Sequence, residues 1–122
     1  MTTVVVNNFV DLQTQIQTPG VLIIEISKDI EFTNEIVGID GIKILKPVCG
    51  LDGVNLIAAL NTRLLRIGIN QKLVLKNVHL VGNGRTNVLG AGIFNSGGIV
   101  DMRNNSSISV RWFDYTRWFD GK

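Results

Sequence analysis

The amino-acid sequence predicts an all-β solenoid, and three observations lead to this prediction. The 13 glycines in 122 residues exceed the usual share of ~7%. Charged residues make up 18% of the chain, below the usual ~25%, and together with many β-branched residues this favours strands joined by tight turns. Short strands that recur at a fixed period are typical of solenoids. Two segments share an alternating apolar run followed by Asn, at a constant offset of 27 residues: Leu73, Leu75 and Asn77, then Val100, Met102 and Asn104.

A strand at 4–6 and one amphipathic helix over about residues 8–17 are the first elements expected. Asn8 is a favourable N-cap, and the Pro-Gly pair at 19–20 ends the helix. A helix in this place covers the end of a solenoid, whose first coil otherwise exposes its core and strand edges. Three apolar residues fall on one helical face: Phe9, Leu12 and Ile16.

Strands are expected from residue 21 onward, with turn pairs at Asp40-Gly41 and Asp52-Gly53. Residues 55–60 fit either a strand or a helix. Alternating or β-branched runs mark the strands: 21–26, 29–32, 36–39, 42–46 and 63–67.

The two segments 27 residues apart make specific predictions about the interior and the corners. One interior wall is expected from the stacked apolar residues, which are Leu73, Leu75, Val100 and Met102. Asn77 and Asn104, one coil apart, can stack as an amide ladder that satisfies backbone groups at a turn. Six glycines are expected to allow positive φ at corners: Gly82, Gly84, Gly90, Gly92, Gly97 and Gly98.

Two stretches carry a resemblance to a known family. On Asn70-Gln-Lys-Leu-Val-Leu-Lys-Asn-Val-His-Leu80 and Gly90-Ala-Gly-Ile-Phe-Asn-Ser-Gly-Gly-Ile-Val-Asp-Met102, the chain resembles right-handed parallel β-helix proteins of the pectin-lyase-like superfamily. It is most similar to non-catalytic autotransporter-like and polymorphic outer-membrane proteins with Gly-Gly-Ala-Ile-Tyr-Asn-Ser-Gly repeats. The likeness covers residues 1–109 and implies a short right-handed parallel β-helix with an N-terminal capping helix. It also implies an extracellular or cell-surface location, although the chain lacks a secretory signal pattern.

Residues 110–122 form an aromatic C-terminal tail outside this likeness, expected either to cap the last coil or to be disordered. The tail repeats one tetrapeptide, Arg-Trp-Phe-Asp, at 111–114 and 117–120. Exposed Trp beside Arg suits protein contact or stacking on sugars. An uncapped last coil predicts an end-to-end homo-oligomer. The candidate interaction surface is Arg111, Trp112, Phe113, Arg117, Trp118 and Phe119.

Charge and cysteine content exclude several classes of function. The net charge is +2 and the 12 basic residues form no run, so binding to nucleic acid or an anionic membrane is not expected. No apolar stretch approaches the ~18 residues of a membrane helix, so the chain is not expected to be transmembrane. One cysteine, Cys49, permits no internal disulfide and is expected to be a small packed hydrophobe. One His and one Cys cannot complete a zinc shell.

Candidate catalytic residues are few, and none is assigned a catalytic role. Asp29 and Glu31 are expected on one strand face, and Glu35 is close to them in sequence. These carboxylates could bind a cation or act as an acid/base pair, but the simplest interpretation is a solvated outer face. His79 is expected as an outward surface histidine, because no nucleophile or carboxylate flanks it. The Gly-rich stretches 82–85 and 90–92 match no phosphate-binding or dinucleotide motif. No cofactor and no metal are expected.

The sequence therefore favours a non-enzymatic structural or adhesive β-solenoid module, a truncated member of a surface-protein family, with a glycan or a protein as its surface ligand. The alternative is a fragment or relative of a polysaccharide lyase or hydrolase that acts on acidic glycans. An ice-binding solenoid is not favoured, because the Thr residues do not recur at the coil period.

Overall fold

The computed structural model describes residues 2–60, 62–83 and 92–110 of the chain. Within these ranges the chain is mostly strand with one short helix, so the all-β prediction is confirmed. The elements follow one another in this order: β1 (Thr2–Val6), α1 (Phe9–Ile16), β2 (Val21–Ile26), β3 (Ile30–Glu31), β4 (Ile36–Val37), β5 (Ile42–Pro47), β6 (Val54–Ile57), β7 (Leu65–Ile67), β8 (Lys72–Lys76), β9 (Val78–Gly82), β10 (Ile93–Asn95), β11 (Ile99–Arg103) and β12 (Ser107–Val110).

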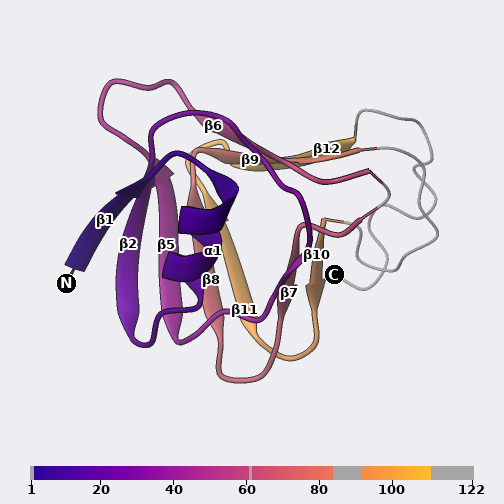
Figure 1. The fold of residues 1–122 in the computed structure, drawn as a ribbon. Helices are drawn as coiled ribbons and strands as arrows, with labels where there is room; N and C mark the ends of the chain where they lie inside the picture. Colours follow the sequence, from indigo (N-terminus) through magenta and orange to yellow (C-terminus); the bar gives the residue numbers. More distant parts are fainter. Residues whose placement is uncertain (1, 61, 84–91, 111–122) are drawn as a thin grey trace.

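The strands form three parallel sheets (Figure 1). Sheet A has the order β1-β2-β5-β8-β11, sheet B has β3-β6-β9-β12, and sheet C has β4-β7-β10. The chain visits A, B and C in turn, from β2 to β4, from β5 to β7 and from β8 to β10, and then returns to A and B with β11 and β12. We call one passage through the sheets a round. Each strand inside a sheet therefore pairs with a strand of the round before and a strand of the round after, so side chains stack in rows across the rounds.

The predicted 27-residue register is confirmed. Leu73 pairs with Val100 and Leu75 pairs with Met102, and both leucines are fully buried. Val100 packs partly against the core, but Met102 is 38% exposed, so the predicted wall is incomplete at its last residue. The reason is that β11 is the last described strand of sheet A and no further described strand stacks on it.

In the described part of the chain, every residue with positive φ that is not glycine is an asparagine. Asn77 and Asn104 have φ values of 57° and 54°, matching their expected place at turns. The main-chain N–H of Asn77 donates to the Arg103 carbonyl at 3.1 Å, and no amide-to-amide bond between the two side chains is seen. Two more asparagines are left-handed: Asn70 and Asn105.

The glycine prediction holds only in part. Gly97 has φ of 126°, as expected for a corner. Gly82 instead lies within β9, paired with Val110. Gly98 does not have positive φ; a Cβ there would lie 2.5 Å from the Gly68 carbonyl oxygen, so close backbone approach excludes a side chain. Gly84 and Gly90 lie outside the described residues.

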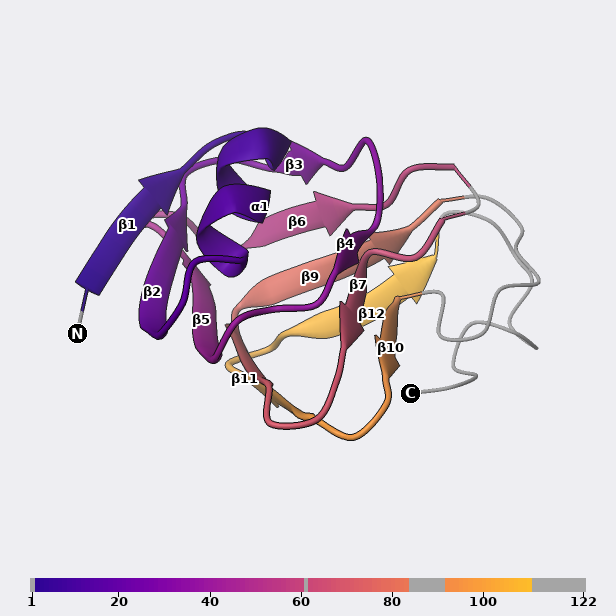
Figure 2. The same cartoon turned by 60° about the horizontal axis from the view of Figure 1, so that its bottom comes forward.

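Helix α1 matches the predicted N-terminal helix. Asn8 is its N-cap, with Oδ1 accepting from the Asp11 N–H at 2.9 Å. The apolar face is buried, and the Phe9 ring lies 5.0 Å from the Phe32 ring. Helix α1 contacts β1 and β2, the first two strands of sheet A, at the N-terminal end of the stacked strands (Figure 2). The helix therefore covers apolar residues at that end.

One charged side chain lies in the core. Lys43 is 0% exposed and stands between Leu22 and Leu73 in the inner row of sheet A. Its Nζ donates to the Gly20 carbonyl at 2.8 Å and to the Asp40 carbonyl. These bonds replace the water that a buried ammonium loses. Burial lowers the pKa of Lys43, opposed by the negative charge of Asp40.

Two other sequence predictions change. The ambiguous segment 55–60 begins as a strand, because β6 spans Val54–Ile57. Cys49 was expected to be packed, but it is exposed in the β5–β6 connection, because the chain turns outward there after Pro47 ends β5. No helix in the described part of the chain is long and apolar enough to cross a membrane.

Candidate functional site

A row of four polar residues runs across the outer face of sheet B. Asn55 of β6 pairs with His79 of β9, and His79 pairs with Ser107 of β12. Asp29 extends the row at the other end, because the next residue, Ile30, pairs with Leu56. Side chains alternate between the two faces of a strand, and Leu56 and Leu80 are buried, so these neighbours face outward. We call Asp29, Asn55, His79 and Ser107 the polar row.

Hydrogen bonds tie the polar row into two pairs. Asp29 accepts twice from Asn55: Oδ1 from the main-chain N–H at 2.9 Å, and Oδ2 from Nδ2 at 3.2 Å. Nδ1 of His79 lies 2.7 Å from Oγ of Ser107. The row therefore holds a carboxylate, an amide, an imidazole and a hydroxyl in fixed positions before any ligand arrives.

The partner of His79 was missed by the sequence reading. Ser107 lies 28 residues further along the chain and reaches His79 only because β12 pairs with β9. No local motif signals this contact, since the connections between successive rounds differ in length.

The His79–Ser107 pair has two of the groups that nucleophilic catalysis needs, but its surroundings do not complete the set. A catalytic histidine is oriented by a third group, and acyl transfer needs hydrogen-bond donors aimed at the developing oxyanion. No described carboxylate contacts His79, and its Nε2 faces Gly53, 3.2 Å from where a Cβ there would lie. The nearby Val78 N–H donates to Ser106 Oγ. Among the described residues, the pair therefore lacks the orienting carboxylate that a catalytic histidine needs.

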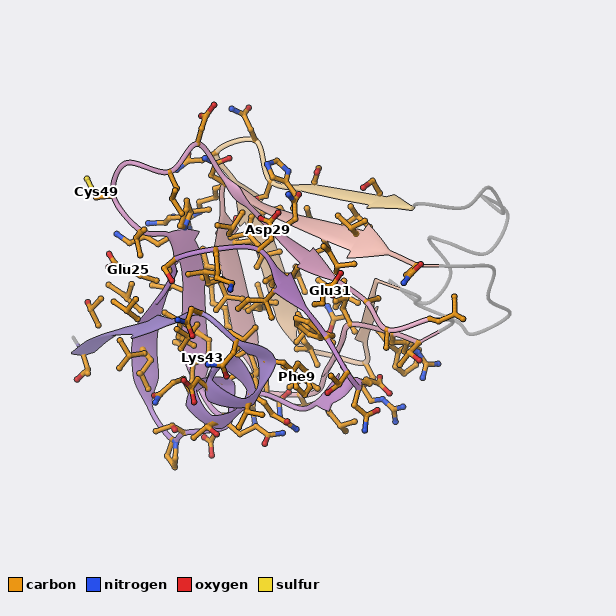
Figure 3. The ribbon with its side chains drawn as sticks, turned by 45° about the horizontal axis from the view of Figure 1, so that its top comes forward. Phe9, Glu25, Asp29, Glu31, Lys43 and Cys49 are labelled. Carbon is orange, nitrogen blue, oxygen red and sulfur yellow. The ribbon has the colours of Figure 1, made fainter. Side chains whose placement is uncertain are left out.

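A cleft of about 480 Å³ adjoins the Asp29 end of the polar row. The cleft lies between the start of α1 and β3, and its lining includes Asp29 and Glu31, which are labelled in Figure 3. The cleft combines hydrogen-bonding groups with apolar side chains, so it can contact a ligand that has both kinds of surface. Its lining includes Asn7, Asn8, Phe9, Lys28, Asp29 and Glu31.

The three candidate carboxylates separate into two places. Asp29 and Glu31 both border the cleft, and both are exposed. Glu35 lies apart from them and accepts from Nε and Nη2 of Arg66, each at 3.2 Å, with Arg63 Nη1 at 3.9 Å. Glu35 therefore forms an ion-pair cluster with Arg63 and Arg66 beside β4 and β7 of sheet C. Among the described residues no three His, Cys, Asp or Glu side chains are placed to hold a metal ion.

The tail predicted as an interaction surface lies outside the described residues. It stays a prediction for Arg111, Trp112, Phe113, Arg117, Trp118 and Phe119. No protein-family model, curated protein or solved structure matches this chain. The family resemblance and the role it implies likewise stay predictions.

Proposed function

We propose that the chain is a short right-handed parallel β-helix with a non-enzymatic structural or adhesive role. The repeated path through sheets A, B and C, with parallel pairing throughout, supports this architecture. Crossover connections between parallel strands are right-handed in ~98% of cases, which supports the handedness. The helix α1 supplies the N-terminal cap.

The polar row is the observation that carries the adhesive role. Its donors and acceptors stand on neighbouring strands, spaced ~4.8 Å apart, on a rigid parallel sheet. Side chains already fixed by mutual hydrogen bonds lose little conformational entropy when a ligand binds. A polymer with closely spaced hydroxyls matches such a row, so we propose a glycan as the surface ligand.

Glycan-array binding of the full chain, followed by calorimetric titration of any hit, tests this role. The variants Asn55→Ala and His79→Ala are expected to weaken binding about tenfold each, the loss of one good hydrogen bond to a ligand. Lys46→Ala on sheet A is the control and should bind like the wild type. An array without signal, or equal losses in all three variants, would contradict the proposal.

The alternative, a polysaccharide lyase or hydrolase acting on acidic glycans, is favoured by one observation. Two carboxylates, Asp29 and Glu31, border the same cleft. Incubation with polygalacturonate and with hyaluronan, followed by chromatography of the products, tests it. Chain cleavage that disappears in Asp29→Asn or Glu31→Gln would replace the non-enzymatic role. Intact polymers after long incubation with the wild type would remove the alternative.

The proposed end-to-end association rests on the last described strands. Met102 of β11, which pairs with the inward Leu75, is 38% exposed where sheet A ends in the described chain. Light scattering on the wild type and on a Trp112→Ala, Trp118→Ala variant tests whether the tail controls this end. A higher mass in the variant supports a capping tail, whereas a lower mass supports a tail that joins two copies. Equal masses would remove the tail from the argument.

A further inference from the structure

The outer face of sheet A differs from the polar row in its chemistry. Besides Val5 of the edge strand β1, three aliphatic side chains point outward with large exposed fractions: Val21 at 43%, Ile42 at 37% and Ile99 at 58%. They belong to one row, because Val21 pairs with Ile42, Ile42 with Lys72, and Lys72 with Ile99. A second row beside it, Ile23, Ile44 and Val74, is also aliphatic.

Nothing described in the structure covers this face. Figure 2 shows α1, sheet B and sheet C all on the same side of sheet A. The outer face therefore presents β-branched side chains to solvent on β2, β5 and β11, whereas Val74 of β8 is only 4% exposed. Exposed apolar surface of this kind commonly marks an interaction site.

Basic side chains border the aliphatic rows. Lys46 forms an ion pair with Glu25 at 3.7 Å, and Arg103 with Asp101 at 2.6 Å. Two lysines remain, Lys72 and Lys76, for which the described residues supply no ion pair. We call the aliphatic rows and these basic residues the basic-apolar face.

The electrostatics of Asp101 agree with this placement. The hydrogen bond from Arg103 is the main cause that lowers the pKa of Asp101. The positive charges of Lys72 and Lys76 lower it further. Both lysines therefore act on the same part of the surface, and the face carries four basic side chains against two carboxylates: Lys46, Lys72, Lys76 and Arg103 against Glu25 and Asp101.

We propose that the basic-apolar face binds the surface of an anionic lipid bilayer. The aliphatic rows offer no hydrogen bonds, so their partner must present apolar surface. Lys72 and Lys76 require negative charge within a short distance of that surface. The interfacial zone of a bilayer with anionic headgroups supplies both, whereas a soluble acidic polymer satisfies only the lysines.

The sequence alone argues against this partner because its basic residues form no run. The parallel register brings Lys46, Lys72 and Arg103 from three different strands onto one face. This site lies on a different sheet from the polar row, so it does not depend on the proposed glycan-binding role.

Vesicle co-sedimentation of the full chain tests the proposal. Binding is expected to vesicles of phosphatidylcholine mixed with phosphatidylglycerol, not to phosphatidylcholine alone, and it should fall as salt screens the lysines. Lys72→Glu and Lys76→Glu should each weaken binding about tenfold or more. Lys28→Glu, at an exposed lysine beside the cleft, makes the same change in net charge and should have little effect.

The aliphatic contribution is tested separately with Ile42→Thr and Ile99→Thr, which keep β-branching and so preserve the strands. Each should weaken vesicle binding about threefold to fivefold. Thermal unfolding monitors folding, and Lys72→Gln and Lys76→Gln replace the Glu variants if those unfold. The proposal is overturned if anionic vesicles are not bound, if Lys28→Glu loses as much binding as Lys72→Glu, or if soluble polyglutamate competes as strongly as vesicles do.

Discussion

Sheets A and B share the same parallel backbone but present opposite surfaces to solvent. On sheet B, the outward residues Asp29, Asn55, His79 and Ser107 satisfy one another by hydrogen bonds. On sheet A, the outward residues are mostly aliphatic or basic, the carboxylates Glu25 and Asp101 are ion-paired, and Lys72 and Lys76 have no ion-pair partner in the described chain. The inward residues of both sheets meet a common core and are nearly all apolar. Packing therefore restricts the inner faces, while each outer face is free to carry its own chemistry.

The inner row of sheet A sharpens this contrast. Lys43 is a buried polar side chain whose ammonium donates to two carbonyls of the protein itself. The polar row is only partly buried, and its groups remain within reach of a ligand. Position within the sheet thus separates a polar residue that is enclosed by the fold from polar residues that remain partly exposed to solvent.

Core truncation should produce the largest loss of stability. Leu45 is fully buried and lies between Ile24 and Leu75 in the inner row of sheet A. Leu45→Ala is expected to lower the free energy of unfolding by about 2–5 kcal/mol through lost burial and a residual cavity. Ile99→Ala on the outer face should cost less than about 0.5 kcal/mol. Urea denaturation of both variants measures the difference, and equal losses would contradict the assigned inner and outer faces.

The buried lysine should give stability an unusual dependence on pH. The pKa of Lys43 in the folded state lies below its ordinary value of 10.5, so the folded chain loses this proton at lower pH than the unfolded chain. The unfolded state then binds more protons, and this group raises the free energy of unfolding as pH increases between the lowered pKa and 10.5. Urea denaturation of the wild type and Lys43→Met across this window isolates the effect. A rise of equal size in both proteins would assign it to other groups.

Removing one hydrogen bond in the polar row should have a smaller effect. Ser107→Ala deletes the contact with His79 and is expected to cost about 0.5–1.5 kcal/mol. Ser109→Ala is the matched control, because Ser109 lies two residues further along β12 and is exposed. Thermal denaturation of both variants provides the comparison. A control variant as unstable as Ser107→Ala would show that the His79 contact contributes nothing special.

The surface ion pair of sheet A should matter least. Lys46 and Glu25 are 3.7 Å apart, with side chains 39% and 26% exposed. Lys46→Ala is therefore expected to change the free energy of unfolding by less than about 1 kcal/mol, and the change should shrink at high salt. Urea denaturation at two ionic strengths checks this expectation. A larger, salt-insensitive loss would mean that the Lys46 side chain contributes packing.

Sequence patterns alone predicted the local features of this fold. Three are confirmed: the helix with its Asn8 cap, the strand-rich chain, and the pairing of Leu73 with Val100. The helix, its cap and the strands depend on interactions between residues that are close in sequence. The pairing of Leu73 with Val100 follows from the 27-residue offset between two similar segments. The same reasoning was wrong at Cys49 and Gly82, where the exposed connection and the strand ending depend on how successive rounds stack.

Only the tertiary structure decided which distant residues meet. Asp29 and Asn55 are 26 residues apart, whereas His79 and Ser107 are 28 apart, so no single period in the sequence connects the polar row. The inward placement of Lys43 and the gathering of basic residues on sheet A have the same origin. The physical reason is that side chains alternate between the two faces of each strand, which the local sequence determines. The lengths of the connections, which are unequal, determine which residue of one strand pairs with which residue of the next. By itself, the sequence determined the strands, the cap and the apolar interior; the register between rounds assigned each polar side chain to the core or to a surface.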